Sequence, residues 1–210
     1  KAVNKRNLNA KYLYDELTKR TIPVAIMEPL LGGSLAKYNY AVAKELTPLD
    51  PEASLAKWAF RFCGSHPNVM TVLSGMTFEE HIKENIKTFS PLKQCSEKEF
   101  EALESAAKAY LGFNTIPCTH CNYCMPCPYG LDIPAHFAFR NNILTMKDYS
   151  SAKEVLDEYN KAIPEPLRRA EHCTGCDRCV SHCPQSINIS KEIAKIDEWI
   201  DGLIDKEIAK

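Results

Sequence analysis

Residues 118–129 read CTHCNYCMPCPY, and residues 173–184 read CTGCDRCVSHCP. The first run spaces its cysteines as C-x2-C-x2-C-x2-C (Cys118, Cys121, Cys124, Cys127), and the second as C-x2-C-x2-C-x3-C (Cys173, Cys176, Cys179, Cys183). A proline follows the last cysteine of each run. Three cysteines at this spacing let one wrapped loop present three thiolates to a small metal core, and the fourth ligand must come from elsewhere. The runs therefore predict two iron–sulfur clusters.

The fourth ligand of each cluster follows from the way paired cubane clusters are bound. In two-cluster ferredoxins the last cysteine of each run ligates the cluster of the other run. On that logic one 4Fe-4S cluster is bound by Cys118, Cys121, Cys124 and Cys183, and the second by Cys173, Cys176, Cys179 and Cys127. Only two residues, Met125 and Pro126, separate the third and fourth cysteines of the first run, whereas three do in the second. The first run therefore departs from the usual ferredoxin spacing at Cys127, and the second keeps that spacing at Cys183. Crossed ligation predicts two clusters close enough to exchange electrons.

Structural zinc and disulfides are the alternatives for these cysteines. Zinc sites usually take two separated C-x2-C pairs per ion, which explains neither three consecutive x2 steps nor the prolines. Disulfides are disfavoured because the chain shows no secretory signal. Cys63 and Cys95 lie outside both runs and are interpreted as ordinary core or surface thiols.

Composition describes a globular protein. The 210 residues are 45% hydrophobic and 25% charged, with 26 basic and 27 acidic side chains and a net charge of −1. This balance provides no electrostatic footprint for nucleic acid or an anionic membrane. No apolar run approaches the roughly 18 residues that span a bilayer. We expect a cytoplasmic protein, and Lys1 in place of Met suggests a piece of a longer or processed chain.

Strands and helices are expected to alternate in the first half. Helical spacing predicts a helix over 8–20, and apolar runs predict buried strands at 22–27 and 69–73. Asp50 and Pro51 suggest the start of a helix that ends near Gly64, and S/T-x-x-E capping boxes predict helices near 78–88 and 97–111. Such alternation implies a parallel sheet covered by helices.

The character of the chain changes after residue 113. Helices are expected at about 134–145, 151–163 and 190–209, two of them within the 45 residues between the cysteine runs. These helices favour a helical arrangement around the clusters over a small β-rich ferredoxin. We place the domains at 1–113 and 114–210.

Two segments of the first half resemble a known enzyme family. Residues 27–36 (MEPLLGGSLA), after one expected strand, and Leu73-Ser74-Gly75-Met76 with Glu84-Asn85, after the next, resemble the last two βα units of an aldo/keto reductase. The cysteine half resembles the helical two-cluster ferredoxin module fused to one bacterial branch of that family. The resemblance implies an α/β fold in which the C-terminal βα units of a (β/α)8 TIM-type barrel, incomplete in this chain, precede an α-helical ferredoxin domain.

The resemblance also implies a nicotinamide cofactor, NAD(P), at the mouth of the barrel. Residues that would contact it are Leu31, Gly32, Gly33, Ser34 and Leu35 along the pyrophosphate, and Gly75, Glu84 and Asn85 at the adenosine end. Basic residues for a 2′-phosphate are replaced by Gly75 and His81. The catalytic residues of the family belong to the first half of the barrel, so no catalytic residue is assigned here.

The leading hypothesis is an iron–sulfur oxidoreductase whose two clusters relay electrons to or from a barrel active site. The alternatives are an electron-transfer protein with a non-catalytic barrel remnant, and clusters with a purely structural role. The expected partner is an external electron carrier, a ferredoxin or flavoprotein, and open strand edges would favour an oligomer. Tyr123 and Tyr129 are candidates to shield the first cluster, although packing is the commoner role of such aromatics.

Overall fold

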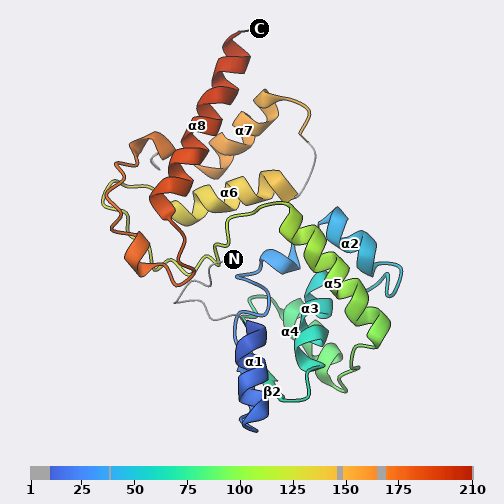
Figure 1. The fold of residues 1–210 in the computed structure, drawn as a ribbon. Helices are drawn as coiled ribbons and strands as arrows, with labels where there is room; N and C mark the ends of the chain where they lie inside the picture. Colours follow the sequence, from blue (N-terminus) through green and yellow to red (C-terminus); the bar gives the residue numbers. More distant parts are fainter. Residues whose placement is uncertain (1–9, 38, 146–148, 165–168, 210) are drawn as a thin grey trace. The chain divides into compact units, whose positions relative to one another are not determined.

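The computed structural model describes residues 10–37, 39–145, 149–164 and 169–209. The chain divides into two compact units, residues 1–112 and 113–210 (Figure 1).

Helices dominate the first unit. Its elements are α1 Ala10–Lys19, β1 Val24–Ile26, the 3-10 helix η1 Ser34–Ala36, α2 Tyr40–Leu46, α3 Leu55–Gly64, β2 Val69–Val72, α4 Glu79–Phe89 and α5 Glu97–Gly112. The two strands pair in parallel, with Val24 opposite Val69 and Ile26 opposite Val72. The predicted parallel pairing is confirmed.

Two buried contacts hold the helices of this unit together. Trp58 of α3 is 1% exposed and packs with Leu46 of α2 and Ala106 of α5. Arg61 of α3 is also buried, and its Nη1 lies 2.9 Å from Oε1 of Glu99 in the first turn of α5. Arg61 further donates to the carbonyl oxygens of Lys93 and Gln94. The Arg61 guanidinium therefore has an ion-pair partner and two carbonyl acceptors, as a buried charge requires.

The expected barrel units are not present. Within the described residues the chain is mostly helical, and the only sheet has two strands, of three and four residues. The α/β expectation, with C-terminal βα units of a (β/α)8 barrel, is therefore wrong. The prediction assumed that the apolar runs 22–27 and 69–73 form strands covered on both faces. Met27 is 74% and Met70 is 72% exposed, so these runs are not enclosed between two layers.

The second unit is helical. It contains α6 Ile133–Thr145, α7 Ala152–Ala162, the 3-10 helices η2 Ala170–His172 and η3 Val180–His182, and α8 Ile189–Ile208. The helices α6, α7 and α8 pack against one another, and irregular loops carry the cysteines (Figure 1). Phe137, Tyr159 and Ile193 are each at most 1% exposed in the core between them. The predicted helical arrangement of this half is confirmed.

No helix of the described residues combines the length and the apolar character needed to cross a membrane.

Candidate iron–sulfur site

The two cysteine loops share one backbone conformation. In each loop the residue before the second cysteine and the residue after it have positive φ: His120 57°, Asn122 62°, Gly175 67° and Asp177 57°. Left-handed residues on both sides of a cysteine curl the chain around a centre, and Asn, Asp and Gly are the residues that tolerate this conformation best. Each short loop can therefore present three thiols to the same side.

The exit from each loop is also repeated. Gly130 and Ser186 have positive φ, and their amides donate to the carbonyl oxygens of Cys127 (3.0 Å) and Cys183 (3.1 Å). The intervening prolines have fixed φ and suit such a turn. In both loops the backbone therefore reverses direction directly after the fourth cysteine.

Each turn leads into a capped helix. Asp132 Oδ1 accepts from the amide of Ala135 at the start of α6, and Asn188 Oδ1 accepts from the amide of Lys191 at the start of α8. The aliphatic residues that flank each cap are buried: Leu131, Ile133, Ile187 and Ile189. The signal was present in the sequence as CPYGLDI and CPQSINI, although only the cysteines were interpreted as a repeat. The repeat extends from the loops into the helices that hold them.

The two loops differ between their third and fourth cysteines. The second loop contains η3 there, whereas the first contains only Met125 and Pro126, joined by a cis peptide bond. The first run is therefore one residue shorter, at the point where the sequence departs from the usual spacing.

One small pocket brings together Cys118, Cys121, Cys124 and Cys183, and we call it the first cysteine pocket. It encloses about 20 Å³, and apolar side chains including Phe137, Ile187 and Ile189 close its inner side. Three of its thiols come from the first loop and the fourth from the second loop. This grouping is the same as the ligand set proposed for the first cluster.

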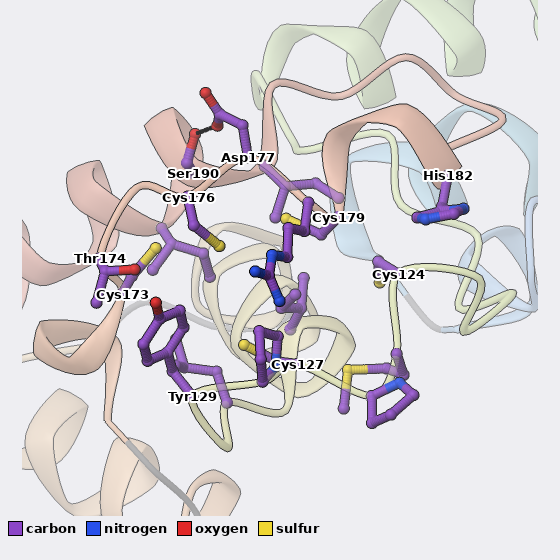
Figure 2. A pocket seen from close by; sticks show the side chains of 18 of the residues that line it. Cys124, Cys127, Tyr129, Cys173, Thr174, Cys176, Asp177, Cys179, His182 and Ser190 are labelled. Atoms are coloured by element: carbon purple, nitrogen blue, oxygen red, sulfur yellow. Dashed lines mark hydrogen bonds between the residues drawn. The ribbon is translucent and has the colours of Figure 1, made fainter.

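A larger pocket of about 350 Å³, the second cysteine pocket, is lined by Cys127, Cys173, Cys176, Cys179 and Cys124. In Figure 2 the first four of these surround a common centre, with Cys124 to one side. Cys124 lines both pockets and therefore lies at their junction. Cys121 and Cys176 are exposed, whereas the other six thiols are half-buried, so each pocket has one outer cysteine.

Burial opposes ionisation of the inner thiols. Loss of hydration raises the pKa of Cys124 and Cys179 to about 11 and also raises the pKa of Cys118. Neighbouring thiols add to this effect across the two runs, from Cys183 on Cys118 and from Cys127 on Cys179. Thiolates are the form that binds metal, so these groups need cationic iron to offset the cost of ionising them in this environment.

These residues fit a pair of cubane clusters. Thiols are the ligand type that 4Fe-4S clusters take; the first cysteine pocket has four of them and the second has five, with Cys124 common to both. Among the described residues, no three His, Cys, Asp or Glu side chains converge as ligands of a single metal ion.

Sequence reasoning misplaced two aromatics. Tyr123 and Tyr129 line the second cysteine pocket rather than the first, and they are 68% and 45% exposed. It also missed a polar contact, in which the Ser190 hydroxyl of α8 donates to the carboxylate of Asp177 (Figure 2). The contact joins residues 13 positions apart in the sequence, and no local sequence pattern predicts it.

The residues expected to contact a nicotinamide lie in the first unit. Gly32, Gly33, Gly75, Glu84 and Asn85 line one cavity of about 590 Å³. Leu31, Ser34 and Leu35 are not among the described residues that line it. The Gly32 amide donates to Oε2 of Glu28 at 2.8 Å, and the Asn85 amide group donates to Oγ of Ser74 at 3.0 Å. The sequence thus identified two loops that share a cavity, but one amide expected to face a phosphate is already bonded to a carboxylate.

Comparison with known proteins identifies one domain. Residues 117–188 match the family model of a 4Fe-4S dicluster domain. No curated protein and no solved structure matches the chain. The second unit therefore contains a ferredoxin-type iron–sulfur domain, whereas the resemblance of the first unit to an aldo/keto reductase finds no support.

Proposed function

We propose that the second unit transfers electrons through two 4Fe-4S clusters with crossed ligation. Cys118, Cys121, Cys124 and Cys183 would hold one cluster, and Cys173, Cys176, Cys179 and Cys127 the other. The observation that carries this assignment is that each pocket is lined by three cysteines of one loop and the last cysteine of the other, with Cys124 shared between the two pockets. When bound, each cluster supplies one-electron redox chemistry at a potential set by its surroundings.

The chain's own residues have distinct roles in this assignment. The curled loops hold the thiols in place, and the apolar wall of the first cysteine pocket excludes water from its inner side. Cys124 lines both pockets, so this ligand of the first cluster would also lie close to the second cluster and shorten the distance that an electron crosses between them. Cys121 and Cys176 are the exposed ligands, and electrons would enter and leave there.

The deciding experiment is an anaerobic analysis of iron, sulfide and zinc with visible absorption before and after dithionite. About eight irons and eight sulfides per chain, with a broad band that bleaches on reduction, are expected for two redox-active 4Fe-4S clusters. Colourless protein with about two zinc ions would overturn the proposal. Clusters that no physiological donor can reduce would instead indicate a structural role.

A second candidate function concerns the cavity of the first unit, which we propose as a nicotinamide nucleotide site. Its support is that the loop at Gly32 and Gly33 and the segment with Gly75, Glu84 and Asn85 line one space. A volume of about 590 Å³ lies within the usual range of ligand sites. The test is titration of NADH followed by its fluorescence.

Substitution of Glu28 provides a control for this titration, because it should change the affinity for NADH in a known direction. A phosphate would have to displace its carboxylate from the Gly32 amide, so the Glu28→Gln variant should bind NADH more tightly than the original chain. No binding by either protein would exclude the nucleotide.

A further inference from the structure

The second cysteine pocket has an unusual rim. Tyr123 and Tyr129 expose 68% and 45% of their surface, and Arg178, Pro126 and Pro128 are exposed beside them. Aromatic residues and arginine are enriched at the centres of protein interfaces. Large exposed apolar groups grouped at one opening indicate an interaction surface more often than scattered ones do.

The repeat shows that this rim is specific to one pocket. Tyr123 occupies the position of Arg178 in the second loop, and Tyr129 that of Gln185. Both tyrosines and Arg178 nevertheless line the second cysteine pocket. The first cysteine pocket has Asn122 and Gln185 among its lining residues and no charged side chain among those described. Two loops of one conformation thus present different surfaces at the two pockets.

Two charged side chains, Arg178 and Asp177, lie at this opening. Asp177 is the only carboxylate among the described lining residues, and it accepts a hydrogen bond from Ser190 in the first turn of α8 (Figure 2). The positive N-terminal end of that 20-residue helix further compensates its charge. Arg178, in contrast, forms no ion pair with any other described residue, and its charge is permanent. Arg178 therefore presents a cation with no ion-pair partner among the described residues, beside exposed tyrosines and prolines.

Resting on the function proposed above, we propose that this rim, consisting of Tyr123, Pro126, Pro128, Tyr129 and Arg178, docks an acidic one-electron carrier protein. A carboxylate of the carrier would pair with Arg178, and an apolar patch beside it would cover the tyrosines. Opposite charges speed association, and the aromatic contacts slow dissociation. Electrons would then pass over the shortest exposed route, through the ligands of the second cysteine pocket.

The test is isothermal titration calorimetry on the full chain with its clusters reconstituted anaerobically. The acidic probe is a plant-type [2Fe–2S] ferredoxin, and the basic probe is cytochrome c. Arg178→Gln should weaken binding of the acidic probe by about tenfold at low ionic strength, and most of this difference should disappear in high salt. Tyr129→Ala should weaken it by a similar factor at any salt concentration, whereas Tyr129→Phe should retain the affinity.

Lys153→Gln provides the matched control, because it removes the same charge from an exposed position on α7 that does not line the pocket. It should leave the affinity within about twofold. Arg178→Gln should bind cytochrome c at least as tightly as the original chain does. An equal loss of affinity for both probes would overturn the inference, as would tight binding of the acidic probe that is indifferent to Arg178 and Tyr129.

Two further readouts separate this inference from the function on which it rests. Iron analysis and dithionite bleaching report on the clusters without any partner, so their failure overturns the proposed function itself. Potentiometric titration of Arg178→Gln should show potentials close to those of the original chain. A large shift together with unchanged affinity would mean that Arg178 tunes a cluster and does not dock a partner.

Discussion

Crossed ligation can be tested by comparing Cys183→Ala with Cys121→Ala. Each variant leaves three thiols at the first cysteine pocket. They differ in what the remaining ligands join, because Cys118 and Cys124 belong to one loop and Cys183 to the other. If the ligation is crossed, only Cys183→Ala would remove the covalent link that the first cluster makes between the loops.

The size of the difference follows from the loop that this link closes. On the proposed ligand set, the second cluster would already tie Cys127 to Cys173, Cys176 and Cys179, and the first would tie Cys118, Cys121 and Cys124 to one another. A link to Cys183 would then close only the segments left between the two clusters, 124–127 and 179–183, roughly 9 residues in total, which corresponds to about 2.5 kcal/mol of chain entropy in the unfolded state. Cys183→Ala should therefore lower the free energy of unfolding by about 2.5 kcal/mol more than Cys121→Ala does.

The assay is anaerobic urea denaturation followed by circular dichroism, with iron measured on the same samples. Cys127→Ala and Cys176→Ala form the corresponding pair at the other pocket and should show the same ordering. Equal destabilisation within each pair would refute crossed ligation, because uncrossed clusters make no link between the loops that one variant alone could remove.

Three further outcomes are expected. Glu99→Gln should lower the free energy of unfolding of the first unit by about 3 kcal/mol at pH 7, because Arg61 lowers the pKa of the Glu99 carboxyl from 4.5 to about 2. A lowered pKa stabilises the folded state above pH 4.5, so the difference between the two proteins should shrink as the pH falls towards 2. Urea titrations across this pH range measure the difference, and a constant value would contradict the pairing. Ile193→Ala should cost about 2–5 kcal/mol and Ile193→Val about 0.5–1.5 in thermal or urea unfolding, because this side chain is fully buried; equal effects of the two would contradict the packing. Burial raises the pKa of Cys63 from 9.0 to about 11, so iodoacetamide should label this thiol at pH 8 about a hundredfold more slowly in the folded chain than in urea. Mass spectrometry follows the labelling, and comparable rates in the two conditions would contradict the burial of Cys63.

Local signals were sufficient for most helices. The Ser96–Glu99 capping box is present with both of its hydrogen bonds, and α5 begins where it predicts. The prediction of a helix start at Asp50 was wrong, because Ser54 caps α3 and its Oγ accepts from the Lys57 amide. Asp50 instead pairs with Nζ of Lys57. A helix start can thus be recognised locally, but competing caps a few residues apart are separated only by the fold.

The barrel prediction failed for a different reason. An apolar run such as 69–73 shows that a strand is suitable for burial, but not that a second layer exists to bury it. That layer would have to come from residues distant in sequence. In the structure only β1 pairs with β2 among the described residues, and Met70 stays exposed. Resemblance of two short loops to a family could not supply the missing strands.

The cysteine site illustrates where sequence information ends. Spacing specifies each loop, because positive φ on both sides of the second cysteine is a property of a few adjacent residues. Which loop provides the fourth thiol depends instead on the packing of α6 against α8, whose contacts join residues about 50 positions apart. Because the two loops share the backbone conformation around their second cysteine, we expect functional differences between the pockets to come from the positions where the repeat differs. At equivalent positions of the repeat the first loop has Asn122 and Tyr123 where the second has Asp177 and Arg178, and the second cysteine pocket has charged and aromatic lining residues whereas the first is smaller and has no charged lining residue among those described.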